Sequence, residues 1–108
     1  MGGSNIKYAE SDLSERLQAL KDSVLSYGIE CNRVAGFRLL NDKCKTTFLQ
    51  FLINYLNAQW AEERELIIPV AVKLITNDYE VRKNYLRFDF KYKGEANWLH
   101  VINEKVWY

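Results

Sequence analysis

The chain has 108 residues, which suits one domain that can bury enough apolar surface to fold without a metal or a disulfide. Apolar residues make up 48% of it, a share that excludes disorder over most of its length. Fifteen basic residues stand against fourteen acidic ones. The net charge of +1 therefore gives no overall electrostatic case for DNA binding, and only local patches could supply one.

The cysteines and the N-terminal sequence indicate in which cellular compartment the protein is expected. Cys31 and Cys44 have no spacing typical of a zinc or redox motif, and the chain holds one histidine. We therefore expect free thiols, no metal site and a cytoplasmic protein. No apolar run reaches the roughly 18 residues of a membrane helix, and the N-terminus lacks the apolar core of a signal peptide. Residues 1–10 are expected to form a flexible leader before a single domain over residues 11–108.

The first predicted helix covers residues 12–27. Asp12 and Glu15 form a D-x-x-E capping pattern at its start, and Gly28 is a suitable C-terminal cap. Between them the apolar residues define one stripe: Leu13, Leu17, Leu20 and Val24. The stripe predicts a helix that packs one face against another element.

Residues 29–40 fit two interpretations. Their alternation would suit a strand, whereas Val34, Phe37 and Leu40 would lie on one side of a short helix. Gly36 weakens both. We favour a short helix or an irregular segment.

A long helix is predicted over residues 42–64, with Asn41 and Asp42 as suitable N-caps. Two apolar stripes run along it: Phe48, Phe51, Leu52 and Tyr55, and Leu49, Ile53, Leu56 and Trp60. A helix that is apolar over so much of its circumference is normally buried. We expect it to be central, with Trp60 at its end as a candidate contact for another chain.

Three strands are predicted over residues 66–75, 84–93 and 98–107. The first is almost continuously apolar, as strands covered on both faces are. Pro69 lacks a backbone donor, which predicts an edge, a bulge or the strand entrance at that point. Residues 76–80 read as a turn, and residues 93–97 read as a hairpin connection. The predicted fold is α+β, with two or three N-terminal helices packed on a C-terminal three-stranded antiparallel meander.

The second strand alternates aromatic and basic residues. One parity is expected to face the helices: Leu86, Phe88, Phe90 and Tyr92. The other carries Tyr85 together with Arg87, Lys91 and Lys93. In the third strand Trp98 and Trp107 differ in parity, so one of them must lie on the outer face. Large apolar groups beside cations on a surface indicate a protein interface.

No constellation of residues indicates catalysis. A Gly-rich phosphate loop is absent from the sequence, and His100 has no evident nucleophile or carboxylate beside it. We expect no catalytic residue, no cofactor and no bound metal.

These patterns predict a small non-catalytic module that binds a protein, of the inhibitor, immunity or phage anti-defence type, without membrane contact. A symmetric homodimer is one way to cover its apolar surface. One alternative is a single-stranded nucleic-acid-binding module that uses the basic strand 82–93, and another is an α+β cone for a small apolar ligand. The predicted partner-binding residues are Trp60, Tyr85, Arg87, Lys91, Lys93, Trp98 and Trp107.

Overall fold

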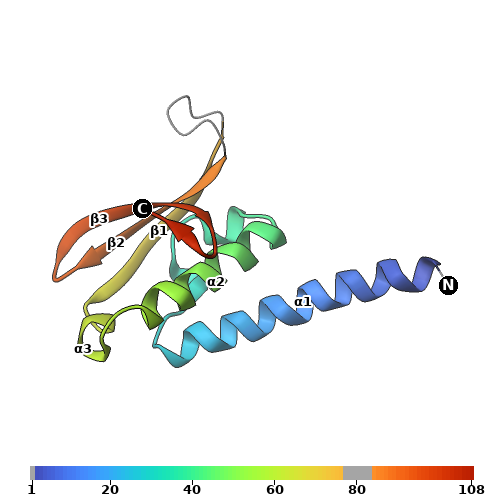
Figure 1. Cartoon of the computed structure of the whole chain (residues 1–108), viewed down its shortest axis with the longest axis horizontal. Helices are drawn as coiled ribbons and strands as arrows, with labels where there is room; N and C mark the ends of the chain where they lie inside the picture. The colour runs from blue at the N-terminus through green and yellow to red at the C-terminus, as the bar shows by residue number, and fades with distance from the viewer. Residues whose placement is uncertain (1, 77–83) are drawn as a thin grey trace.

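Three helices precede a four-stranded antiparallel sheet in the computed structural model, which describes residues 2–76 and 84–108, with side chains from Leu13 onward (Figure 1). The helices are α1 (Gly2–Ser26), α2 (Asp42–Asn57) and α3 (Ala61–Arg64), with two 3₁₀ helices, η1 (Cys31–Arg33) and η2 (Phe37–Leu39), between α1 and α2. The strands are β1 (Ile67–Ile75), β2 (Tyr85–Tyr92), β3 (Glu95–Asn103) and β4 (Val106–Trp107), in that order across the sheet.

The arrangement confirms the predicted α+β fold of N-terminal helices and a C-terminal meander. The sheet has one more strand than we predicted, because a turn at Glu104 and Lys105 divides the third predicted strand into β3 and β4. The predicted turn at residues 76–80 lies, apart from Thr76, outside the described residues. So do residues 82 and 83 of the basic strand.

α2 lies between the sheet and α1 and forms the centre of the core (Figure 1). Its Phe48 and Phe51 are fully buried and contact the Phe88 ring of β2, with centroid separations of 5.4 and 5.6 Å. Tilted and edge-on rings at this spacing add to the burial of apolar surface. The prediction that this helix is buried is confirmed.

α1 begins at Gly2, so the predicted start at Asp12 is wrong. The helix runs through the segment that we expected to be a leader, and in Figure 1 its N-terminal part extends beyond the other elements. A capping pattern contributes only about 1 kcal/mol, and helix-favouring residues such as Ala9 and Glu10 precede Asp12, so nothing in the sequence ends the helix there.

The end of α1 follows the prediction. Gly28 has a positive φ of 81°. Its N–H donates to the carbonyl of Leu25 at 2.8 Å, and the N–H of Ile29 donates to the carbonyl of Val24 at 3.2 Å. This pair of bonds is the Schellman pattern, in which glycine readily adopts the left-handed conformation.

α2 ends at Asn57, so the single helix predicted over residues 42–64 is wrong at its C-terminal end. Trp60 has extended backbone, with φ −64° and ψ 153°, and α3 starts after it. The break is held by Arg64, whose Nε donates to the carbonyl of Leu56 at 2.8 Å. That carbonyl lies in the last turn of α2 and also accepts from the N–H of Gln59 at 3.2 Å.

The break also changes the position of the acidic residues. Glu62 and Glu63 lie in the first turn of α3, where a helix dipole favours negative charge, rather than at the end of a long helix. The Glu63 carboxylate accepts a hydrogen bond from the Tyr92 phenol of β2, and this contact joins α3 to the sheet.

Residues 29–40 form the short helical and irregular segment that we favoured. Between η1 and η2, Ala35 pairs with the edge of β1: its N–H donates to the carbonyl of Val70 at 3.0 Å, and its carbonyl accepts from the N–H of Val72 at 2.9 Å. Gly36 follows with φ 83°, and a Cβ there would lie 2.2 Å from the carbonyl oxygen of Val72. Only glycine allows the segment to approach β1 this closely.

β1 is an edge strand with a shift of register between Pro69 and Ala71, so the predicted edge or bulge at Pro69 is confirmed. The prediction that this strand is covered on both faces is wrong, because Ile68, Val70 and Leu74 are exposed. The helices lie on one side of the sheet (Figure 1), and apolar composition alone does not reveal how many layers cover a strand.

β2 and β3 form a tight hairpin. Tyr92 pairs with Glu95, and the two residues between them, Lys93 and Gly94, have φ values of 53° and 81°. Positive φ at both central positions is the type I′ geometry that suits the twist of paired strands.

Candidate functional site

The sheet has one face toward α2 and one face turned away from the helices, which we call the outer face. On β2, Leu86, Phe88 and Phe90 are buried toward α2, so the predicted core parity of this strand is confirmed. The strand register then assigns the outer face to Ile68, Ala71, Lys73, Ile75, Tyr85, Arg87, Asp89, Lys91, Ala96, Trp98, His100 and Tyr108.

Four rings, from β2, β3 and the residue that follows β4, meet on the outer face. The His100 ring lies 4.7 Å from Tyr85, 4.5 Å from Trp98 and 4.6 Å from Tyr108, measured between ring centroids. Tyr85 is buried under this cluster, whereas Trp98 and Tyr108 are 44% and 58% exposed. The cluster is therefore a surface feature with a buried base.

Arg87 is held between an aromatic ring and a carboxylate. Its guanidinium carbon lies 4.3 Å from the centroid of the Trp98 ring, within the range of a cation–π contact. Its Nη2 donates to Asp89 Oδ1 at 3.1 Å, and its Nε donates to Asp89 Oδ2 at 3.2 Å. These contacts fix a side chain that would otherwise sample many rotamers.

The cluster brings together some of the predicted partner-binding residues and leaves others apart. Tyr85, Arg87 and Trp98 lie in it, and Lys91 is exposed on the same face, paired with Ala96 in the strand register. Lys93 lies in the hairpin turn, with its Nζ 5.3 Å from the centroid of the Tyr92 ring.

The other two predicted tryptophans lie away from the outer face. Trp107 faces α2 and makes edge contacts with Phe51 at 5.4 Å and Tyr55 at 6.0 Å between centroids. Trp60 is 81% exposed just before α3. Of the two tryptophans with opposite parity, Trp98 is therefore the one on the outer face.

Four residues that contribute to the site on the outer face were not predicted as site residues: Lys73, Asp89, His100 and Tyr108. His100 and Tyr108 exchange two backbone hydrogen bonds of 2.8 and 3.0 Å, which place them side by side. His100 and Tyr108 can pair only if the chain turns back between them. The sequence feature that could have revealed this pairing is therefore the turn at Glu104 and Lys105. Asn103 supports that turn by accepting a hydrogen bond from the N–H of Lys105.

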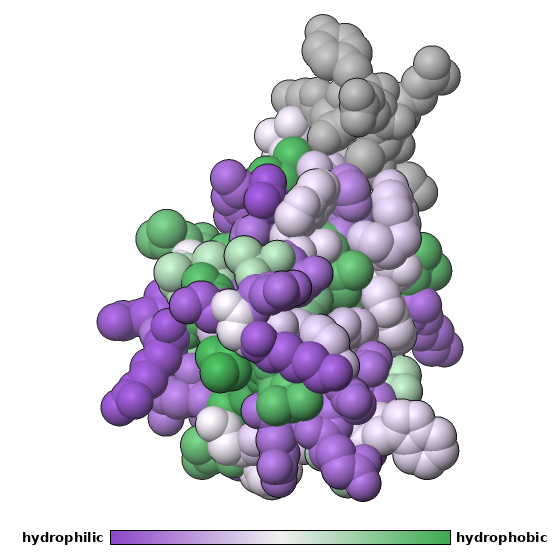
Figure 2. Space-filling view, turned by 90° about the vertical axis from the view of Figure 1, so that its left-hand side faces the viewer, coloured by the Kyte–Doolittle hydropathy of each residue, from purple (hydrophilic) through white to green (hydrophobic). Residues whose placement is uncertain are grey.

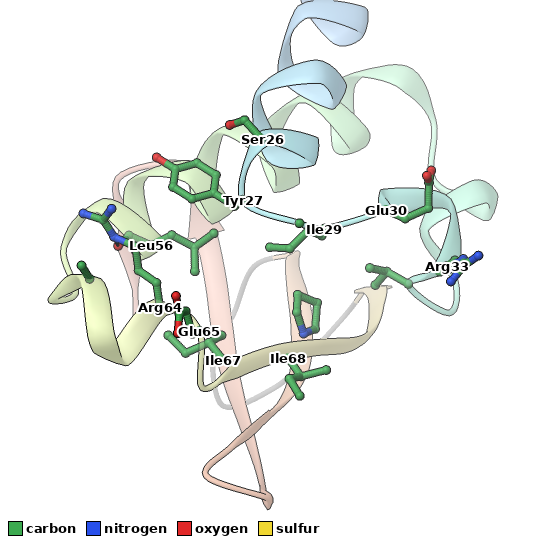
Figure 3. A pocket seen from close by; sticks show the side chains of 14 residues that line it. Ser26, Tyr27, Ile29, Glu30, Arg33, Leu56, Arg64, Glu65, Ile67 and Ile68 are labelled. Carbon is green, nitrogen blue, oxygen red and sulfur yellow. Dashed lines mark hydrogen bonds between the residues drawn. The ribbon is translucent and has the colours of Figure 1, made fainter.

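A pocket of about 550 Å³ lies elsewhere, between the end of α1, η1, α3 and the start of β1. Figure 3 shows Arg64 and Glu65 at one end of it and Glu30 and Arg33 at the other, with apolar side chains such as Ile29 and Ile67 between them. Its volume falls in the range of small-ligand sites, but the charges of the four end groups cancel. The pocket therefore has an apolar centre and no preferred ligand charge.

The side of the molecule near α3 and the β2–β3 turn shows no single large apolar area. In Figure 2 apolar atoms gather in the lower half of this side and are interrupted by hydrophilic ones. The exposed apolar residues close to α3 in the chain are Trp60, Leu66 and Ile68. Of these, Ile68 lines the pocket, and none of the three belongs to the four-ring cluster.

Burial changes the reactivity of one group in the core. Desolvation raises the pKa of the Cys31 thiol above its ordinary value, and the nearby Lys21 only partly opposes this. Cys31 is a buried free cysteine of the core, and Cys44 is a half-buried free cysteine in the first turns of α2. A neutral buried thiol is a poor nucleophile.

Among the side chains that the structure describes, those of residues 13–76 and 84–108, no group of three or more His, Cys, Asp or Glu residues could hold a metal ion. In the same described part of the chain, no helix combines the length and the apolar character needed to span a membrane. A comparison with models of protein families gives no match, and neither curated proteins nor solved structures show a significant similarity to this chain.

Proposed function

We propose that this chain is a small non-catalytic module that binds a protein through its outer face. The observation that supports this is the exposed aromatic cluster around His100 with Arg87 fixed on it. An antiparallel sheet with one solvated face usually presents polar side chains there. Trp, Tyr and Arg are instead the residues that supply most of the binding energy at protein interfaces.

The fixed geometry of Arg87 favours binding. A side chain that is immobilised only on association costs about 0.5–1.5 kcal/mol in lost freedom. Asp89 and Trp98 already hold Arg87, so this cost is largely met in the folded chain. Trp98 and Arg87 together form a rigid anchor of the kind that interface centres contain.

Proteins that act by covering a partner need no catalytic group. Inhibitors, immunity proteins and phage anti-defence proteins work in this way, and we place the chain in that class by its chemistry and size. The cytoplasmic location that we expect from the cysteine pattern is part of the proposal. A symmetric homodimer through the exposed apolar groups is a further part of it, and light scattering at micromolar concentration tests this separately.

The outer face can be tested with three immobilised baits: the wild type, Trp98→Ala and Leu39→Ala. Leu39 is 90% exposed on η2, is not among the residues of the outer face, and serves as the matched control. A protein retained by the wild type and Leu39→Ala but lost with Trp98→Ala supports the proposal. Equal retention by all three baits contradicts it.

One observation favours a second candidate, the binding of single-stranded nucleic acid. The sequence separates aromatic and basic residues along β2, but the fold places Trp98, His100 and Tyr108 on the face that carries Lys73, Arg87 and Lys91. Aromatic rings beside cations are what such binding requires. The rings here pack on one another, however, and the guanidinium of Arg87 lies over Trp98, which leaves less open ring surface for bases.

The third hypothesis, an apolar ligand in a cone between helices and sheet, has less support. Phe48, Phe51 and Phe88 fill the space between α2 and the sheet with mutual ring contacts. A ligand would instead have to use the pocket beside α1, whose centre is apolar.

A further inference from the structure

The register of the four strands aligns a row of basic and aromatic side chains across the outer face. Lys73 of β1 pairs with Arg87 of β2, Arg87 pairs with His100 of β3, and His100 pairs with Tyr108 after β4. Directly opposed residues in an antiparallel pair have Cβ atoms about 4.5–5.5 Å apart. The row therefore places two basic side chains and an imidazole on adjacent strands.

Like charges directly opposite each other in a sheet are destabilising. Asp89 neutralises Arg87, but among the described residues Lys73 has no ion-pair partner. The outer face carries the cations Lys73, Arg87 and Lys91, and its one acidic side chain among the residues that the structure describes is Asp89. The surplus charge is positive and lies beside the aromatic cluster.

We propose that this row recognises carboxylate groups of an acidic surface on the partner protein. The inference rests on the proposed function and gives the partner's contact surface its chemistry. Complementary charge at an interface directs association and excludes wrong partners. The exposed Trp98 and Tyr108 then contact apolar groups beside the partner's carboxylates.

The stereochemistry of Arg87 supports a carboxylate ligand. Asp89 accepts from Nε and Nη2, which form one edge of the planar guanidinium. The other edge, formed by Nη1 and the second hydrogen of Nη2, has no acceptor among the described residues. Arginine offers its five N–H donors in a fixed fork that fits two oxygens of a carboxylate at once. A second carboxylate can therefore bind end-on while Asp89 remains in place.

Other occupants fit this row less well. A second copy that docks row against row about a two-fold axis would bring two positively charged rows together, which costs free energy, so the homodimer proposed above would have to form through apolar groups outside the row. A nucleic acid would satisfy the charge, but it would need open ring faces for stacking. The rings of His100 and Tyr108 stack on each other at 4.6 Å with an interplanar angle of 19°. An acidic protein surface needs only the cationic edge and the exposed ring edges.

The row can be tested with acetylated hexaglutamate as the probe, followed by ¹⁵N NMR titration of the full chain at low salt and at about 150 mM salt. Saturable shifts at Lys73, Arg87 and His100, with an affinity that falls as salt rises, are expected. Lys73→Glu should weaken binding by about tenfold or more. Lys43→Glu is the matched control, because Lys43 is exposed in the first turn of α2 and undergoes the same change of charge.

Arg87→Lys tests whether binding needs the planar donor geometry of the guanidinium or only its positive charge. Lysine keeps the positive charge but lacks the planar pair of donors. A clear loss of hexaglutamate affinity in Arg87→Lys supports end-on binding. Unchanged affinity in this variant, or equal losses in Lys73→Glu and Lys43→Glu, would overturn the inference.

Single-stranded oligo(dT), titrated in parallel, tests whether the row binds the phosphates of a nucleic acid rather than the carboxylates of a protein. Tighter binding of oligo(dT) than of hexaglutamate, with the same dependence on Lys73, would overturn the acidic-protein inference. Lys73→Glu, added as a fourth immobilised bait to the three described above, then distinguishes the failure of this inference from the failure of the proposed function. A partner lost with Trp98→Ala but retained by Lys73→Glu would refute the carboxylate row and leave the proposed function standing.

Discussion

Trp98 and Trp107 lie on opposite faces of the sheet. Trp98 stands on the outer face under the guanidinium of Arg87, and Trp107 packs edge-on against Phe51 of α2. The same residue type therefore serves two purposes in one short segment of chain. Trp107 closes the core near the C-terminus, and Trp98 forms part of the proposed binding surface.

Alanine substitution should separate these purposes. Trp107→Ala should lower the free energy of unfolding by about 2–3 kcal/mol, because it removes ring contacts with α2 from a half-buried position. Trp98→Ala should lower it by less than about 1 kcal/mol, since Trp98 lies on the outer face with 44% of its surface exposed. Urea denaturation followed by circular dichroism measures both. Similar losses in the two variants would contradict the assignment of faces.

Gly36 provides a test of the approach of Ala35 to β1. Gly36→Ala should destabilise the fold by at least about 2 kcal/mol, because the new Cβ would meet the carbonyl of Val72 and the residue would keep a positive φ. Gly94→Ala is the matched control. It has a similar φ but open space around the Cβ position, so it should cost only about 1–2 kcal/mol.

The comparison of the two glycine variants uses the midpoint and slope of urea denaturation. A larger loss in Gly94→Ala than in Gly36→Ala would mean that the segment between η1 and η2 does not contact β1 as described. An equal loss would mean that the backbone conformation alone sets the cost.

The two thiols should react at different rates. In the native protein Cys44 should react first with a colorimetric disulfide reagent, because it is half-buried, whereas Cys31 is buried and its pKa is raised by desolvation. Raising the pH should speed the reaction of Cys31 by increasing its thiolate. Denaturing, non-reducing conditions should release both thiols, and Cys44→Ser identifies which one reacts. A faster Cys31 in the native state would contradict its place in the core.

Much of the fold could be predicted from the sequence because periodicity reports directly on burial. The apolar stripes along α2 and the alternation in β2 predicted a buried helix packed on one face of the sheet. Gly28 predicted the end of α1 through its backbone freedom. The end of α2 could not be predicted, since it depends on Arg64 folding back to the carbonyl of Leu56. Such a contact is tertiary and leaves no local pattern.

The candidate site was predicted only in part for a similar reason. Parity along β2 selected Tyr85 and Arg87, and parity along the last strand required one outward tryptophan. Parity within a strand does not say which residues of different strands are neighbours. The pairing of Lys73 with Arg87, and of His100 with Tyr108, depends on register across the sheet, which the turns decide.

The hydrogen bond between Tyr92 and Glu63 makes the stability of the fold sensitive to alkaline pH. The Tyr92 phenol donates to the Glu63 carboxylate, and this bond is the main reason that the pKa of Tyr92 is raised above its ordinary value of 10.0. Because the pKa is higher in the folded than in the unfolded chain, the unfolded state loses the proton first. The stabilisation from neutral Tyr92 is thus fully present below about pH 10 and is lost as the pH rises toward the folded-state pKa.

Tyr92→Phe should remove this dependence. The wild type should be more stable than Tyr92→Phe near neutral pH, and the difference between their free energies of unfolding should shrink above about pH 10. Glu63→Gln keeps an acceptor for the phenol without its charge, so the wild-type advantage over this variant should also narrow in alkali. Urea denaturation at neutral and alkaline pH measures the differences, while Tyr55, whose pKa burial raises, is present in all three proteins. A difference between wild type and Tyr92→Phe that stays constant across this range would show that the contact between α3 and β2 does not hold the tyrosine proton.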